Sequence, residues 1–242
     1  MSRRKAVQRL ESIYIGRNNT NLEMTRDRLI RGGSYRDLST ICVIPTRGLI
    51  PTKVVQGLLS LASPMNQKFL RIFIENMEVG EAYNTGIETI LTNPELSKWK
   101  YVLTVEEDNI VPPDGLLRLY ESMGKFDAVS GLYFVKGENG AAMIYGNVHE
   151  MPMNFIPQLP IPDQIVECNG VGMGFCLFKL DMFKKIPKPW FKTLQEFQPG
   201  QGMRAATQDL YFCQNAKAFG YRFAVDCRIR VGHYDHNTQT VW

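Results

Sequence analysis

From residue 40 onward, hydrophobic residues alternate between short apolar runs and longer stripes with helical spacing. Three apolar runs predict buried strands, at 41–44, 69–74 and 101–105. The stripes between and after them predict helices that begin near Pro51, near Gly80 and near Pro112. Strands that alternate with helices in this way are typical of an α/β fold, in which helices cover both faces of a sheet.

The pattern changes after Asp127. A strand is expected over 128–135, followed by a glycine-rich turn, and antiparallel pairing is favoured there. Four prolines between 151 and 163 exclude a regular helix or central strand and predict an ordered loop over the sheet. The remaining elements are expected as a strand at 175–178, a short helix at 181–185, a polar lid loop at 195–207, a helix at 208–219 and a strand at 222–225.

Composition narrows the class of protein. Hydrophobic residues make up 44% and charged residues 21% of the 242 positions, which excludes a disordered chain and a multi-span membrane protein. No apolar run approaches the roughly 18 residues that span a bilayer, so no stable membrane insertion and a cytoplasmic location are expected. The five cysteines form no CxxC pair and are expected to be reduced core residues. The net charge is +4, with basic residues frequent in the first forty positions, as in a solvated arm.

An acidic tripeptide follows the third predicted strand. Glu106, Glu107 and Asp108 would repel one another on a loop, and a divalent cation relieves that repulsion by coordination. Oxygen ligands suit Mg²⁺ or Mn²⁺, and a small number of protein ligands implies that a phosphate-bearing substrate completes the coordination sphere. The alternative is a solvated acidic turn without a ligand.

Two further positions carry candidate chemistry. Asp209 lies in the first turn of a predicted helix, where it is either a favourable partner of the helix dipole or a general base facing a cleft. His233 and His236 follow the last predicted strand. They have no cysteine pair nearby, which disfavours a structural zinc site, and a single histidine that joins Asp108 around Mn²⁺ fits better.

Other nucleotide-binding motifs are missing from the sequence or lie in the wrong context. The glycines at 170–174 precede a predicted strand instead of joining a strand to a helix, which disfavours a dinucleotide-binding dehydrogenase or a methyltransferase. The sequence contains neither a GxxxxGK[ST] phosphate loop nor a GxSxG nucleophile elbow.

The order of these motifs resembles that of the GT-A glycosyltransferases, in particular family 2. The similarity spans residues 40–236. It is carried by the segments 43–47, Glu75 with 80–84, 106–114, 172–178 with Phe183, and 207–213 followed by 220–226 and His233. The resemblance implies a GT-A (nucleotide-diphospho-sugar transferase) fold with a mixed, mostly parallel sheet flanked by helices. It also implies a basic extension at 1–38 and one catalytic domain at 39–242, with a nucleotide-sugar half at 39–126 and an acceptor half at 127–242.

The resemblance further implies a site. Asp108 and His233 would be ligands of Mn²⁺ or Mg²⁺, with Glu106 and Asp108 as the DxD-type pair, and Asp209 would be the catalytic base of an inverting transfer. The donor would be a nucleotide sugar, a UDP-sugar in the first place. The residues implied to bind it are Pro45, Thr46, Arg47, Glu75, Asn84, Glu106 and Glu107.

Three positions depart from the family pattern. Glu106 replaces the usual first aspartate, Tyr83 replaces an arginine before Asn84, and Gln208 replaces the usual acid before the base. Two alternatives stay open: a sugar nucleotidyltransferase, and a non-catalytic module that binds an anionic ligand. The acceptor is not defined by the sequence, and a nucleic-acid acceptor stays open.

Overall fold

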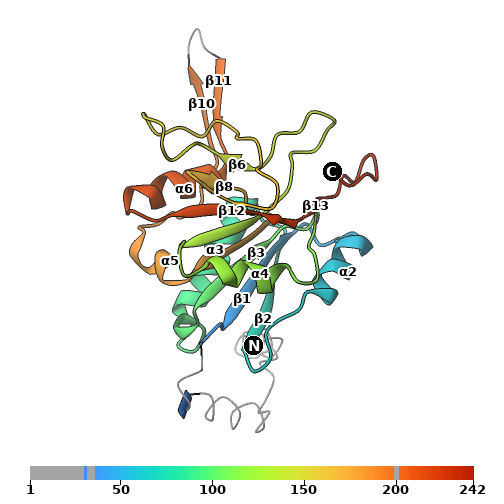
Figure 1. Ribbon diagram of the computed structural model, residues 1–242, viewed down its shortest axis with the longest axis vertical. Helices are drawn as coiled ribbons and strands as arrows, with labels where there is room; N and C mark the ends of the chain where they lie inside the picture. The colour runs from blue at the N-terminus through green and yellow to red at the C-terminus, as the bar shows by residue number, and fades with distance from the viewer. Residues whose placement is uncertain (1–29, 32–35, 199–201) are drawn as a thin grey trace, which may run out of the picture.

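The computed structural model describes residues 30–31, 36–198 and 202–242 of the chain (Figure 1). Most of the basic extension expected at 1–38 therefore lies outside the described residues. The centre of the fold is a seven-stranded sheet. Its strands, in spatial order, are β2 (Phe69–Glu75), β1 (Thr40–Thr46), β3 (Tyr101–Val105), β9 (Phe175–Lys179), β5 (Ala128–Leu132), β12 (Phe223–Arg230) and β7 (Ile165–Cys168).

Most strands of this sheet run in one direction. β1 is parallel to β2 and β3, and β5 is parallel to β12, whereas β9 and β7 are antiparallel to their neighbours. The reversed strand β9 lies between β3 and β5 and so joins the two predicted halves of the chain in one sheet. The fold class predicted from the sequence, a mixed and mostly parallel sheet flanked by helices, is confirmed. The antiparallel pairing expected for β5 holds on its β9 side, while its β12 side is parallel.

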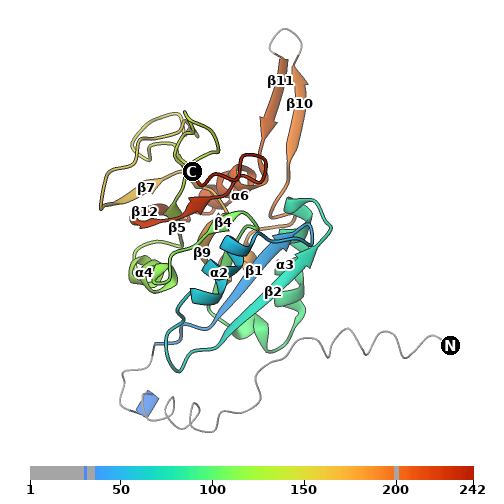
Figure 2. The same ribbon diagram turned by 90° about the vertical axis from the view of Figure 1, so that its right-hand side faces the viewer.

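Helices cover both faces of the sheet because successive strand residues point to opposite faces. Ile41 and Val43 of β1 belong to one buried cluster and Cys42 and Ile44 to the other. The first cluster packs under α3 (Val79–Thr92), α5 (Asp181–Lys185) and α6 (Gln208–Ala218). The second packs under α2 (Thr52–Ser60) and α4 (Gly115–Ser122), and a short 3-10 helix, η1 (Leu96–Lys98), precedes β3. Figures 1 and 2 show this three-layer arrangement.

Most predicted elements are present, but the strand expected over 128–135 ends at Leu132, and two further predictions are wrong. The segment expected to be a lid loop forms an antiparallel hairpin of β10 (Leu194–Gln198) and β11 (Gly202–Ala206), which projects from the body of the molecule (Figures 1 and 2). The last large strand, expected to end near Val225, continues to Arg230. The proline-containing segment is a loop, as predicted, with one isolated bridge between Tyr145 and Pro157.

Two small sheets add contacts that the hydrophobic pattern does not predict. β4 (Asn109–Ile110) pairs with β13 (Gly232–His233), and β6 (Ile144–Tyr145) pairs with β8 (Gly170–Val171). Each strand in these pairs has two residues, which is too short to give a hydrophobic alternation. The β4–β13 pair joins the loop after β3 to the C-terminal segment.

Candidate functional site

The carboxyl ends of the parallel strands meet at one edge of the sheet, where ligands bind in open α/β folds. β1 ends at Thr46, β2 at Glu75, and the acidic tripeptide begins directly after β3. β12 leads into β13, which carries His233, and the chain after β5 leads to Lys136 at the same edge. Residues that are far apart in the sequence therefore lie around one corner, which we call the acidic corner: Glu106, Asp108, Lys136 and His233.

The predicted pair of metal ligands lies together in this corner. His233 is opposite Asn109 in the β4–β13 pair, and the Tyr234 amide donates a hydrogen bond of 2.7 Å to the Asp108 carbonyl. The His233 Nε2 atom lies 3.5 Å from Asp108 Oδ2. Both side chains are mostly buried, with 15% and 17% of their surfaces exposed, so a small ligand can still reach them.

A second contact sets the orientation of the His233 ring. Its Nδ1 atom lies 2.7 Å from the carbonyl oxygen of Phe134, and because a carbonyl only accepts, Nδ1 carries the proton. The other ring nitrogen, Nε2, faces Asp108. The rings of Tyr133 and His233 pack in a T-shaped pair, with their centroids 5.6 Å apart. A histidine whose other nitrogen is held by a backbone carbonyl is the usual arrangement for a metal ligand.

Lys136 is a residue of this corner that the sequence analysis missed. Its Nζ atom lies 2.5 Å from Asp108 Oδ2, the same oxygen that faces His233. Burial opposes ionisation of Asp108, but the contacts with His233 and Lys136 outweigh it and lower the Asp108 pKa to about 2. Asp108 is therefore ionised at neutral pH, with an ammonium group beside it.

Glu106 differs from the anionic ligand that a DxD-type pair requires. Its Oε1 atom accepts a hydrogen bond of 3.4 Å from the Tyr83 hydroxyl. Burial, followed by repulsion from the charges of Asp108 and Asp209, raises the Glu106 pKa to about 8. The carboxyl group is thus mostly protonated at pH 7 and is a neutral neighbour of Asp108. Its membership of a DxD-type pair with Asp108 stays a prediction.

Glu107 joins two strand ends instead of facing a ligand. Its Oε2 atom accepts hydrogen bonds from the Thr46 hydroxyl at 2.8 Å and the Arg47 amide at 2.7 Å, and its Oε1 atom accepts one from Arg47 Nε at 2.5 Å. Burial opposes ionisation, yet these hydrogen bonds outweigh it and lower the Glu107 pKa. Glu107 therefore holds the loop after β1 in place, and its expected contact with the nucleotide stays a prediction.

The other residues predicted to bind the nucleotide lie at the same edge with unequal access. Glu75 is exposed and lies beside Thr46 in the β1–β2 register. Arg47 is mostly exposed, whereas Pro45 is buried within β1 and Thr46 is 7% exposed. Glu75 and Arg47 are thus the members of this group that a bound nucleotide could reach by their side chains.

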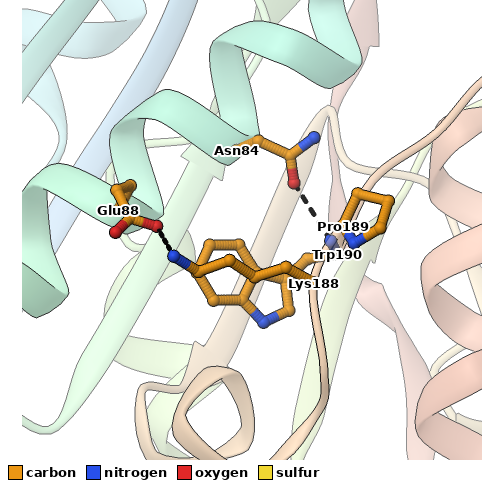
Figure 3. A pocket seen from close by; sticks show the side chains of 5 residues that line it. All are labelled: Asn84, Glu88, Lys188, Pro189 and Trp190. Atoms are coloured by element: carbon orange, nitrogen blue, oxygen red, sulfur yellow. Dashed lines mark hydrogen bonds and ion pairs between the residues drawn. The ribbon is translucent and has the colours of Figure 1, made fainter.

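Asn84 is hydrogen-bonded to the chain that follows α5. Its amide nitrogen donates to the Phe191 carbonyl at 2.7 Å, and its oxygen accepts from the amides of Trp190 and Phe191 at 3.1 Å each. It lines a pocket of about 350 Å³ beside α3, together with Glu88, Lys188, Pro189 and Trp190 (Figure 3). Lys188 pairs with Glu88 across this pocket. Asn84 thus holds the chain after α5 by its hydrogen bonds, and its predicted contact with the nucleotide stays a prediction.

Asp209 lies close to the acidic corner. It is 5% exposed in the first turn of α6, and its charge is close enough to Glu106 to raise the Glu106 pKa. Burial raises the pKa of Asp209 itself, although hydrogen bonds from Thr207 and the Leu210 amide oppose that shift. Among the described residues, the hydrogen bonds from the Thr207 hydroxyl and the Leu210 amide both end on Oδ1.

The corner fits a divalent cation that takes other ligands from a substrate. Within residues 36–198 and 202–242, no group of three or more His, Cys, Asp or Glu residues is placed to hold a metal ion. Asp108 and His233 are the two candidate ligands, and their separation of 3.5 Å is close to the roughly 3 Å between neighbouring ligands of one cation. Magnesium in particular is often held by one or two carboxylates and by substrate phosphates.

Comparison with known proteins establishes the fold alone. No protein-family model matches the chain, and no curated protein matches its sequence. Among solved structures, "A197 from STIV" superimposes with a TM-score of 0.59 at 17% identity, over 84% of this chain and 92% of that one. The fold of this chain is therefore similar to that of A197.

Two weaker likenesses have TM-scores below 0.5. S. aureus TarS 1-349 in complex with UDP-GlcNAc gives 0.43 at 12% identity, over 77% of this chain and 55% of that one. The inositol-1-phosphate CTP transferase from T. maritima gives 0.42 at 14% identity, over 90% of this chain and 78% of that one. Likenesses of this size do not establish a shared activity.

In the described part of the chain, no helix has the length and apolar character needed to cross a bilayer.

Proposed function

We propose that this protein is a glycosyltransferase, which moves a sugar from a nucleotide-diphosphate sugar to the hydroxyl group of an acceptor. The observation that carries the proposal is the convergence of Asp108, His233 and Asp209 at the carboxyl edge of the parallel strands. A phosphate-bearing ligand that bound at this edge would lie beside a candidate base. A UDP-sugar is the donor that we would test first.

The donor half of the reaction requires charge stabilisation. Cleavage of the bond between the sugar C1 atom and the phosphate places negative charge on the leaving nucleoside diphosphate. Asp108 and His233 would hold Mn²⁺ or Mg²⁺ beside that diphosphate. When bound, such a cation acts as a Lewis acid for the developing charge. Glu75 and Arg47, which are exposed at the ends of β2 and β1, would border the nucleotide.

The acceptor half requires a base. Asp209 would accept the proton of the acceptor hydroxyl as its oxygen attacks C1 from the side opposite the diphosphate, with inversion of the anomeric configuration. A raised pKa suits this role because a base works best when its pKa approaches the working pH. The Thr207 hydroxyl and the Leu210 amide fix the Asp209 carboxylate through Oδ1.

A sugar nucleotidyltransferase is less well supported. Such an enzyme must grip a triphosphate, for which a glycine-rich loop with basic residues after the first strand is the usual device. Here the loop after β1 carries Arg47, and the Arg47 guanidinium is paired with Glu107.

A turnover assay tests the proposal. The chain is incubated with a panel of nucleotide sugars, with and without Mn²⁺, and release of the nucleoside diphosphate is measured. We expect turnover of at least one donor, and a loss of about 10²- to 10⁴-fold in Asp209→Asn, the usual contribution of a general base. Asp108→Asn should also be impaired.

The matched control is Asp127→Asn, because Asp127 also pairs with a lysine but is hydrogen-bonded to residues at the other ends of β9 and β12. It should retain turnover. The proposal fails if no donor is consumed or if Asp209→Asn is as active as the unmodified chain. NMR of the anomeric proton of the product tests inversion separately.

A further inference from the structure

Lys136 places a positive charge in the acidic corner, where a bound diphosphate would need one to offset the nearby carboxylates. Its ammonium group contacts Asp108 Oδ2, and it is close enough to the carboxyl groups of Glu106 and Asp235 for its charge to act on both. His233 faces the same Asp108 oxygen. A diphosphate that approached these carboxylates without a counter-charge would be repelled.

The backbone around Lys136 is built to hold it there. The chain after β5 turns back on itself, with the Val135 amide donating to the Ala141 carbonyl at 2.9 Å and an isolated bridge between Phe134 and Ala142. A side chain at Gly140 would lie 1.7 Å from the Val135 carbonyl oxygen, so the turn requires glycine. The Phe134 carbonyl also accepts the hydrogen bond from His233 Nδ1. The turn therefore contacts both proposed metal ligands: Asp108 through the Lys136 side chain, and His233 through the Phe134 carbonyl.

The ammonium group can also reach a ligand. The Lys136 side chain is 31% exposed, and a lysine ammonium has three donors, of which Asp108 takes one. Lysine binds phosphate as a compact charge on a flexible chain, which allows it to turn from Asp108 to a ligand without backbone movement. Arg47, another exposed cation at the same edge, is already paired with Glu107.

We propose that Lys136 is a diphosphate-binding residue: its ammonium is held by Asp108 in the ligand-free chain and contacts the diphosphate of the donor when the donor binds. This inference rests on the proposed function and adds a residue to it. It implies that the chain retains affinity for a nucleoside diphosphate when divalent cations are removed, because this positive charge belongs to the protein.

Calorimetric titration with UDP in the presence of EDTA tests the inference. We expect the unmodified chain to bind UDP under these conditions and Lys136→Met to bind it about 10- to 100-fold more weakly, the usual effect of losing a hydrogen bond to a charged group. Affinity for uridine, which lacks phosphate, should be unchanged. Lys136→Arg keeps the charge and should recover part of the affinity.

The control variant is Lys179→Met, because Lys179 pairs with Asp127 and lies opposite Tyr101, at the far end of β3. It should bind UDP as the unmodified chain does. Equal UDP affinity of Lys136→Met and the unmodified chain would overturn the inference, and so would binding that requires Mn²⁺ in the unmodified chain; the proposed function survives both results. If the unmodified chain binds no uridine, cytidine, adenosine or guanosine diphosphate, with or without Mn²⁺, the proposed function and the inference fall together.

Discussion

His233 Nε2 lies 3.5 Å from Asp108 Oδ2, although the two residues are far apart in the sequence. The two-residue pairing of β4 with β13 brings them together, and the hydrogen bond from the Tyr234 amide to the Asp108 carbonyl fixes the register. The Phe134 carbonyl then aims the ring. The strand pairing, the Tyr234 amide and the Phe134 carbonyl thus together fix the position of His233 relative to Asp108.

Replacement of His233 by alanine should weaken Mn²⁺ binding by at least about tenfold, because one of two protein ligands is lost. Electron paramagnetic resonance of free Mn²⁺ during a titration measures this directly. His236→Ala is the matched control, since His236 is exposed and packs on Tyr234 instead of Asp108. If both variants bind Mn²⁺ equally well, His233 is not a ligand.

Removal of Lys136 should have the opposite effect on Mn²⁺. In the nucleotide-free chain its ammonium contacts the oxygen that would bind the cation, and like charges at this distance repel by about 1 kcal/mol or more. We therefore expect Lys136→Met to bind Mn²⁺ about tenfold more tightly in the same titration. Lys179→Met should show no change. Weaker Mn²⁺ binding by Lys136→Met would mean that Lys136 supports the cation site and does not compete with it.

The edge of the sheet that carries the site follows from the sequence, because each apolar run ends in polar residues at a strand terminus. β3 was predicted at its observed bounds, and Glu106 and Asp108 follow it directly. The grouping of His233 with Asp108 was predicted from the residue types and from the family resemblance, not from the hydrophobic pattern. The pairing that achieves this involves two residues in each strand, and such short strands have no periodicity to detect.

Lys136 and Glu107 show what sequence patterns cannot reveal. Lys136 lies before a glycine-rich turn and looks like an ordinary exposed lysine, and only the folded turn places it on Asp108. Glu107 is one of three adjacent acids, and its direction depends on the strand twist and on the loop after β1. The hairpin of β10 and β11 was mistaken for a loop because its sequence is polar and contains glycine.

Replacement of Glu107 by alanine should destabilise the fold. Three hydrogen bonds are lost and the Thr46 hydroxyl loses its buried acceptor, so a cost of about 2–4 kcal/mol in the free energy of unfolding is expected. Urea denaturation measures it. Glu95→Ala is a suitable control, because Glu95 pairs with Lys68 at the exposed surface and should change stability by less than about 1 kcal/mol. A small effect at Glu107 would show that the loop after β1 does not depend on this carboxylate.

Gly174 should not tolerate a side chain. A Cβ atom at this position would lie 2.5 Å from the Oδ1 atom of Asn109, which is fully buried next to Asp108. We expect Gly174→Ala to cost about 1–3 kcal/mol, as overpacked sites do, and to weaken Mn²⁺ binding through displacement of Asn109. Gly124→Ala is the control, because nothing lies within 4 Å of its Cβ position. Equal stability of the two variants would show that Asn109 can move aside.

Asp209→Asn should separate activity from stability. Burial raises the folded-state pKa of Asp209 above its usual value of 3.8, so its contribution to stability is greatest below that pH and is lost as the pH rises through the folded-state pKa. Asparagine removes the cost of burying an ionised carboxylate, and its oxygen can still accept the hydrogen bonds from Thr207 and the Leu210 amide. At pH 7 we therefore expect the variant to lose turnover while its thermal midpoint rises by about 2–4 °C, the shift that 1 kcal/mol gives in a chain of this size. The gain should shrink toward pH 4, and Asp127→Asn, which loses an ion pair with Lys179, should show no gain at pH 7. A lower midpoint for Asp209→Asn at pH 7 would mean that the carboxylate is there for structure, and the base would have to be sought elsewhere in the corner.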